Sequence, residues 1–174
     1  KMEPTGFAVS TSIAREMYEE GLNYEHGLDN DEYKARQCYV AAAALNYGPA
    51  QSQLAEFYFY GKGGLRKSEE MAFKYFHLSA DNEDAKGQCN LGMFYENGMA
   101  GLAQDNNEAA RYYHLAADQG FPAAQNNLAA MYEYGKGRKK DLDRAKVLYK
   151  LAAESGNKQG IHNFERICAL HNRM

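Results

Sequence analysis

The chain has 174 residues, of which 45 % are apolar and 25 % are charged, so it can bury a sizeable core and lies within the range of globular proteins. A net charge of −3 argues against nonspecific nucleic-acid binding, because that activity depends on a basic surface. No apolar run approaches the roughly 18 residues that span a bilayer, and no signal peptide is visible at the start.

The tetrapeptide Tyr-x-x-Gly occurs four times, and its successive tyrosines are 40, 37 and 37 residues apart. A fixed period of this length is typical of stacked supersecondary units. Each copy begins with an apolar stripe at helical spacing, which predicts a first helix that packs on a neighbour. The stripes are Ser10, Ala14, Tyr18 and Gly21; Ala50, Leu54, Tyr58 and Gly61; Gly87, Leu91, Tyr95 and Gly98; Ala124, Leu128, Tyr132 and Gly135; and finally Gly160, Phe164 and Cys168.

Each of the four glycines that close these stripes is predicted to end its helix in the left-handed conformation. A second helix follows each loop, and in one of them Asp105 and Glu108 have the spacing of a capping box. The longer first spacing predicts a small insertion near residues 44–47. The second stripes are Ala35, Tyr39, Ala42 and Ala43; Ala72, Phe76, Ser79 and Ala80; Ala109, Tyr113, Ala116 and Ala117; and Ala145, Tyr149, Ala152 and Ala153.

These elements predict an all-α fold, a right-handed superhelical α/α solenoid of about four helix hairpins followed by a capping helix over about 158–171. Each hairpin would bury its apolar faces only by stacking on its neighbours, so we expect one undivided, monomeric domain. The expected boundaries are an N-terminal extension over 1–9 and a repeat domain over 10–174, with repeats at about 10–48, 49–84, 85–121 and 122–157.

The hairpins resemble the Sel-one-like repeat family, relatives of the tetratricopeptide repeat. The segments AQNNLAAMYEYGKG (124–137) and AKVLYKLAAESG (145–156) carry the resemblance, as do LGMFYENG (91–98) and AARYYHLAADQG (109–120). The family's tryptophan position holds Cys38, Tyr75, Tyr112 and Leu148 here. The resemblance, which is to a family with many bacterial members, implies a scaffold or adaptor that holds a protein partner along a concave surface. It implies neither an enzyme nor a cofactor.

The helical wheel of each first helix also defines the face opposite the core, which in tetratricopeptide-like arrays lines the concave groove. Acidic side chains mingle with aromatic ones on this face, so we expect it to bind a basic or amphipathic segment of a partner protein. The alternative is a solvated helix face without function. The predicted groove residues are Glu16, Glu19, Ser52, Glu56, Phe59, Tyr60, Cys89, Met93, Glu96, Asn97, Asn126, Glu133, Tyr134, His162 and Arg166.

Other patterns indicate function more weakly. A basic patch runs through the fourth hairpin loop, and a solvated turn explains it better than phosphate, nucleic-acid or lipid contact. Ser155 and Lys158 form S-x-x-K, which raises a hydrolase of β-lactam or cell-wall type as the alternative function, but the S-D-N and K-T-G elements are missing. His77 and His114 stand in successive repeats, too far apart to share a zinc ion, so we expect no metal site.

The cysteines Cys38, Cys89 and Cys168 form no C-x-x-C motif and no matched pair within a hairpin, so we expect no disulfide framework. That favours a cytoplasmic location, whereas removal of a leader would leave a periplasmic or secreted one open. Cys89 falls on the predicted groove face, but nothing nearby in sequence would lower its pKa and make it reactive.

Overall fold

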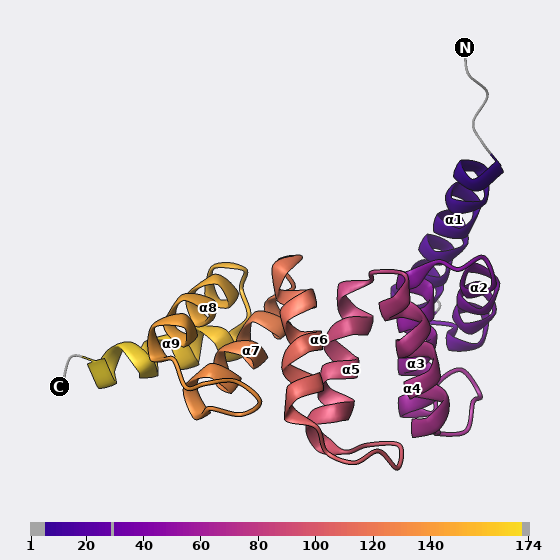
Figure 1. Cartoon of the computed structure of the whole chain (residues 1–174). Helices are drawn as coiled ribbons and strands as arrows, with labels where there is room; N and C mark the ends of the chain where they lie inside the picture. The colour runs from indigo at the N-terminus through magenta and orange to yellow at the C-terminus, as the bar shows by residue number, and fades with distance from the viewer. Residues whose placement is uncertain (1–5, 29, 172–174) are drawn as a thin grey trace. The chain divides into compact units, whose positions relative to one another are not determined.

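A computed structural model describes residues 6–28 and 30–171, and within these ranges the chain forms nine α-helices (Figure 1). The helices are α1 (Gly6–His26), α2 (Glu32–Ala44), α3 (Gly48–Tyr60), α4 (Glu69–Asp81), α5 (Ala85–Asn97), α6 (Asn106–Asp118), α7 (Pro122–Tyr134), α8 (Leu142–Glu154) and α9 (Lys158–His171).

The helices pack pairwise in sequence order. Helix α1 packs on α2, α3 on α4, and α7 on α8, while α2 packs on α3, α6 on α7, and α8 on α9. In the third pair, the ring of Tyr95 in α5 stacks on the ring of Tyr112 in α6. The all-α repeat array predicted from the periodic stripes is therefore confirmed.

The chain divides into two compact units, Lys1–Gly87 and Gln88–Met174. The first unit holds α1 to α4 and the start of α5, and the second holds the rest of α5 and α6 to α9. Each unit is described by itself below.

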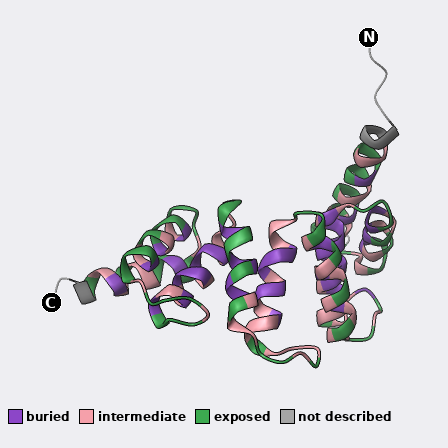
Figure 2. Ribbon diagram, viewed as in Figure 1, coloured by how far each residue is buried: buried purple, intermediate pink, exposed green. Residues whose placement is uncertain are grey.

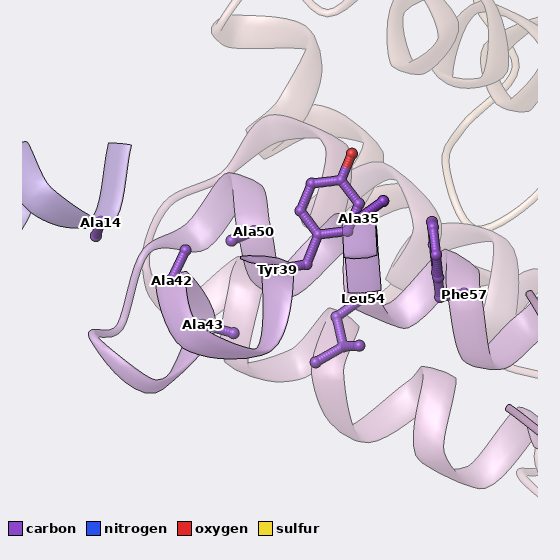
Figure 3. Close-up of a cluster of buried hydrophobic side chains, with 8 residues drawn as sticks. All are labelled: Ala14, Ala35, Tyr39, Ala42, Ala43, Ala50, Leu54 and Phe57. Carbon is purple, nitrogen blue, oxygen red and sulfur yellow. The ribbon is translucent and has the colours of Figure 1, made fainter. Parts of the chain in front are cut away.

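The core of the first unit brings together small residues and a few large rings (Figure 3). Tyr39, Leu54 and Phe57 are almost wholly buried among alanines of α1, α2 and α3, and the rings of Tyr39 and Phe57 meet edge to face at 5.4 Å. Alanine lets the helix backbones approach closely, so the aromatic side chains fill the remaining space. Each large side chain buried in this way contributes about 1.5–3 kcal/mol.

The second unit repeats this arrangement. Ala129, Ala145, Tyr149 and Ile167 form a buried cluster between α7, α8 and α9. Tyr132, Leu148, Phe164 and Cys168 pack against the cluster and remain partly accessible. Figure 2 shows buried residues recurring along the helices between exposed ones. The core thus comes from the predicted stripes, although their first-helix tyrosines are only half-buried.

The helix ends use local sequence signals. Gly61 and Gly135 end α3 and α7 with φ of 73° and 69°, the left-handed conformation that glycine adopts without steric cost. Asp105 caps α6 by accepting hydrogen bonds from the backbone N–H groups of Asn107 and Glu108. The Glu108 carboxylate binds Arg111, and the Asp105 N–H donates to the carbonyl of Tyr95. The predicted capping box is therefore formed on one side only.

Two local predictions for the first repeat are wrong. Gly21 does not end a helix, because α1 continues to His26. Gly21 is buried instead, and a Cβ there would lie 2.6 Å from the ring of Tyr39, so glycine makes room for that ring. The insertion lies in the extended α1 and the turn after it, not at residues 44–47, because Tyr18 and Tyr39 are three residues further apart than Tyr58 and Phe76.

Candidate protein-binding surface

A buried or half-buried carboxylate underlies the first-helix surface in three of the four repeats. In the first repeat, Glu25 at the end of α1 accepts hydrogen bonds from the hydroxyl of Tyr39 and the amide of Gln53, each at 2.8 Å. Lys62, in the loop after α3, completes the set with an ion pair of 3.1 Å. The carboxylate thus joins the first hairpin to the second.

The third and fourth repeats build a similar cluster, but their carboxylate directly follows the tyrosine of the Tyr-x-x-Gly motif. The hydroxyl of Tyr113 donates to Glu96 at 2.9 Å, and Lys136 from the next loop lies 3.6 Å from the same carboxylate. The hydroxyl of Tyr149 donates to Glu133 at 2.8 Å. Arg166 of α9 binds both oxygens of Glu133, at 2.7 and 2.6 Å. Such a bidentate pair is among the stronger charge-assisted contacts.

The second repeat departs from this pattern at all three positions. Phe59 stands where the carboxylate is expected, and Phe76 stands where the tyrosine is expected. The third position is the cation that the loop of the following repeat supplies. Lys62 and Lys136 supply it from directly after the glycine of their loops, whereas Met99 takes that place in the third loop. A buried hydroxyl or carboxylate without its partner costs free energy, so it is physically consistent that the three polar groups disappear together.

In the first and fourth repeats, the partners of the carboxylate lower its pKa. The hydrogen bonds from Arg166 lower the pKa of Glu133 against the effect of burial, and Tyr149 adds to them. Burial opposes ionisation of Glu25, but hydrogen bonds from Tyr39, Gln53 and Lys62 outweigh it and lower the pKa of that carboxyl. Glu25 and Glu133 therefore make charged structural contacts in the pH range where proteins function.

The structure places the fifteen predicted groove residues at three levels of exposure. The exposed ones are Glu16, Glu19, Tyr60, Asn97, Tyr134 and His162. The half-buried ones are Glu56, Phe59, Met93, Glu96 and Arg166. The buried ones are Ser52, Cys89, Asn126 and Glu133.

The buried positions have partners inside their own unit. The side chain of Asn163 in α9 donates to Asn126 at 2.9 Å, and Ser52 donates to the carbonyl of Pro49 at 3.0 Å. Glu133 is held by α8 and α9, as described above. A first helix in an array is covered by more than its own second helix, so a single-helix wheel overstates the width of its free face.

Two exposed tyrosines occupy equivalent places on the first helices. Tyr60 is the last residue of α3 and is 65 % exposed, and Tyr134 is the last residue of α7 and is 61 % exposed. Phe59 lies beside Tyr60, with the two rings edge to face at 4.9 Å. Exposed aromatic rings on rigid helices are suitable anchors for a protein partner.

The acidic part of the surface is narrower than the sequence indicates. Lys86 pairs with Glu56 at 2.8 Å, and Lys136 lies 3.6 Å from Glu96. Glu16 and Glu19 on α1 are exposed and form no ion pair in the described ranges. Unneutralised negative charge on the predicted surface is therefore concentrated on the first helix.

The weaker sequence signals have ordinary local surroundings. At the start of α8, Arg144 pairs with the N-cap residue Asp141 at 3.2 Å, and Ser155 ends the helix as its C-cap. His77 lies 3.1 Å from Asp81 of its own helix. Burial raises the pKa of Cys89 to about 12, which leaves a neutral thiol of low reactivity.

The three cysteines are free. In the part of the chain that the structure describes, no group of three or more His, Cys, Asp or Glu side chains could hold a metal ion. Within the same residues, no helix combines the length and the apolar character that crossing a membrane requires.

Comparison with solved structures finds the same array elsewhere. A Sel1 repeat protein from Oxalobacter formigenes is 29 % identical, with a TM-score of 0.81 over 98 % of this chain and 68 % of that one. Helicobacter pylori cysteine rich protein B is 25 % identical, with a TM-score of 0.59 over 79 % of this chain and 98 % of that one.

The protective antigen c5321 of uropathogenic Escherichia coli, described as having an SLR fold, is 24 % identical. Its TM-score is 0.75 over 92 % of this chain and 34 % of that one, a likeness that concerns the fold alone. This chain therefore spans about a third of that protein.

No curated protein matches the chain. The family model of the Sel1 repeat matches it four times in succession, at residues 12–47, 48–84, 85–121 and 122–157. Because these matches cover most of the sequence and coincide with the four helix hairpins, the chain belongs to the Sel1 repeat family.

Proposed function

We propose that the chain is a non-catalytic scaffold or adaptor that binds a partner protein or peptide on the exposed face of its first helices. The observation that carries this proposal is the pair of largely exposed tyrosines, Tyr60 and Tyr134, at equivalent ends of α3 and α7. Each lies one residue from a polar or aromatic cluster that fixes its helix, so the surface loses little conformational entropy on binding.

The chemistry of the partner follows from the accessible charge. Glu16 and Glu19 are exposed on α1, whereas Glu56 and Glu96 already have lysine partners. In the first unit, a segment with basic residues would gain attraction at α1, and its apolar or aromatic side chains would pack on Tyr60. In the second unit, Tyr134 offers a similar anchor by itself. The charge would mainly speed association and set orientation, while the rings would supply most of the affinity.

Selection of random short peptides on the purified chain tests this proposal. We expect the enriched peptides to combine lysine or arginine with apolar residues. Their affinity should fall about tenfold, which corresponds to about 1.4 kcal/mol, in Tyr60→Ser or Tyr134→Ser. In the Glu16→Gln, Glu19→Gln variant, the salt dependence of binding should weaken.

Tyr33→Ser supplies the matched control, because Tyr33 is 55 % exposed but lies on a second helix, α2. Its substitution should leave the affinity unchanged. Peptides whose affinity falls in the Tyr33 variant and not in the Tyr60 or Tyr134 variants would show that the first-helix face is not the binding surface.

A further inference from the structure

The second unit has a surface pocket of about 370 Å³ between α6 and α8, with α7 as its floor. His114 and Asp118 line it from α6, Leu128 and Tyr132 from α7, and Asp143, Arg144 and Leu148 from α8. The volume falls at the lower end of the range of about 300–1,000 Å³ for ligand pockets, so it suits a single side chain better than a helix.

The pocket lies where the fourth repeat departs from a ring pair found in the second and third. The rings of Tyr58 and Tyr75 are stacked at 5.5 Å with an interplanar angle of 9°. The rings of Tyr95 and Tyr112 are stacked at 5.6 Å with an angle of 7°. In the fourth repeat, the residues at these positions are Tyr132 and Leu148.

The first repeat also lacks the second tyrosine, since Cys38 takes that position, but there another ring compensates. Tyr47 meets Tyr18 edge to face at 5.5 Å. Among the described residues, no ring stacks on Tyr132 as Tyr75 and Tyr112 do on their partners. The guanidinium of Arg144 lies over its ring at 5.6 Å and donates a hydrogen bond to its hydroxyl at 3.4 Å. The pocket therefore holds a tyrosine without the ring partner that its three counterparts have.

The charges at the rim favour a cation beside the bound group. Asp118 stands on the α6 wall and Asp143 on the α8 wall. Asp143 has no ion pair in the described part of the chain, whereas Asp141 neutralises Arg144 at 3.2 Å. His114 lies 3.5 Å from Asp118 and offsets its charge only when protonated. The unpaired charge at the pocket is thus negative.

We propose that this pocket binds an aromatic side chain of a partner peptide, flanked in that peptide by lysine or arginine. The guest ring takes the place that Tyr75 and Tyr112 occupy in their own repeats, stacked on Tyr132 and packed against Leu148. Flanking cations meet Asp118 and Asp143. The site uses the α6–α8 side of the unit, so it goes beyond the proposed first-helix surface and does not depend on it.

The chain has no tryptophan, so the fluorescence of a tryptophan in the peptide reports its own burial. The probe is the capped tripeptide Lys-Trp-Lys, with Glu-Trp-Glu and Lys-Ala-Lys as comparisons, titrated to millimolar concentration. We expect a saturable blue shift with Lys-Trp-Lys and weaker binding of Glu-Trp-Glu. Lys-Ala-Lys should not compete with Lys-Trp-Lys.

The deciding variant is Leu148→Tyr, which restores the ring found in the second and third repeats and should weaken Lys-Trp-Lys binding at least about tenfold. Leu151→Tyr is its matched control, because Leu151 is a 42 % exposed leucine of the same helix outside the pocket. Circular dichroism of both variants checks that the helices are retained. If Leu148→Tyr fails to fold, Asp143→Lys keeps the test decisive, because it should reverse the preference between Lys-Trp-Lys and Glu-Trp-Glu.

Absence of a saturable shift would overturn the proposal. So would equal affinity of the Leu148 and Leu151 variants, or an unchanged peptide preference in the Asp143 variant. Tyr60→Ser and Tyr134→Ser should not alter Lys-Trp-Lys binding at this pocket. Failure of the first-helix surface and failure of the pocket therefore give different results.

Discussion

Removal of the Glu133 carboxylate should destabilise the second unit by about 3 kcal/mol. The side chain is 7 % exposed, and it accepts hydrogen bonds from Tyr149 and from both terminal nitrogens of Arg166. Breaking a buried ion pair costs about 3–5 kcal/mol, because the remaining charge is left without compensation. Arg166 is 33 % exposed and regains some water in Glu133→Ala, so the lower end of that range applies.

Urea denaturation followed by circular dichroism measures this loss as a lower midpoint at unchanged slope. Glu19→Ala is the matched control, since Glu19 also follows the tyrosine of a Tyr-x-x-Gly motif but is exposed, and it should change stability by less than about 0.5 kcal/mol. Equal losses in the two variants, or a loss below about 1 kcal/mol for Glu133→Ala, would refute the reasoning.

A compensated variant separates the cost of the orphaned partners from the value of the cluster. The second repeat has Phe59 and Phe76 at the carboxylate and tyrosine positions, so the array accepts an apolar version. Glu133→Phe combined with Tyr149→Phe and Arg166→Met should recover most of the stability lost in Glu133→Ala, because replacing a whole buried polar set by apolar groups is often neutral.

Three further outcomes follow from the backbone and from the pKa shifts. Ala100 has φ of 54°, so Ala100→Gly should raise stability by about 0.5–1 kcal/mol, seen as a higher midpoint of thermal unfolding. Gly137→Ala should lower stability by at least about 2 kcal/mol, because φ is 61° and a Cβ would overlap the carbonyl oxygen of Asn106. The folded-state pKa of Glu133 lies below the unfolded value of 4.5, so its contribution is present above pH 4.5 and is lost as pH falls through the folded pKa. Stability measured from neutral to acid pH should therefore fall less in Glu133→Gln than in the unaltered chain, and an equal fall would contradict this assignment.

Most of the fold could be predicted because each repeat carries local signals for its helices and for their ends. Leu54 recurs as Leu91 and Leu128, and the ring of Tyr39 recurs as Phe76, Tyr113 and Tyr149. The left-handed glycines Gly61 and Gly135 end their helices where the sequence places them. Gly21 has the same local signal and does not end α1. Tertiary packing decides the outcome there, because the buried ring of Tyr39 requires glycine in mid-helix.

The candidate surface could be predicted only in part, because side-chain burial in an array depends on neighbours that a single-helix wheel omits. The wheel places Tyr60 and Tyr134 on the outside, where the structure also has them. It places Asn126 and Glu133 beside them, yet both are buried by contacts with α9. The sequence did contain a signal that Glu133 is a buried hydrogen-bonding group. Its repeat has both a carboxylate and a tyrosine at the paired positions, and the second repeat lacks both.

Departures from the repeat pattern therefore fall into two kinds. In the first kind, a buried polar group is lost and its hydrogen-bond partner is lost with it. Phe59 and Phe76 replace the carboxylate and the tyrosine together, because an unpaired hydroxyl or carboxylate costs free energy. Where a ring is lost at the surface, the cost is small and compensation is optional. The ring of Tyr47 contacts Tyr18 in the first repeat, whereas the half-buried Leu148 lines an open pocket beside Tyr132. An uncompensated departure leaves space at a rigid surface without weakening the core. For that reason we place a second binding site at Leu148 rather than at the better-preserved repeats.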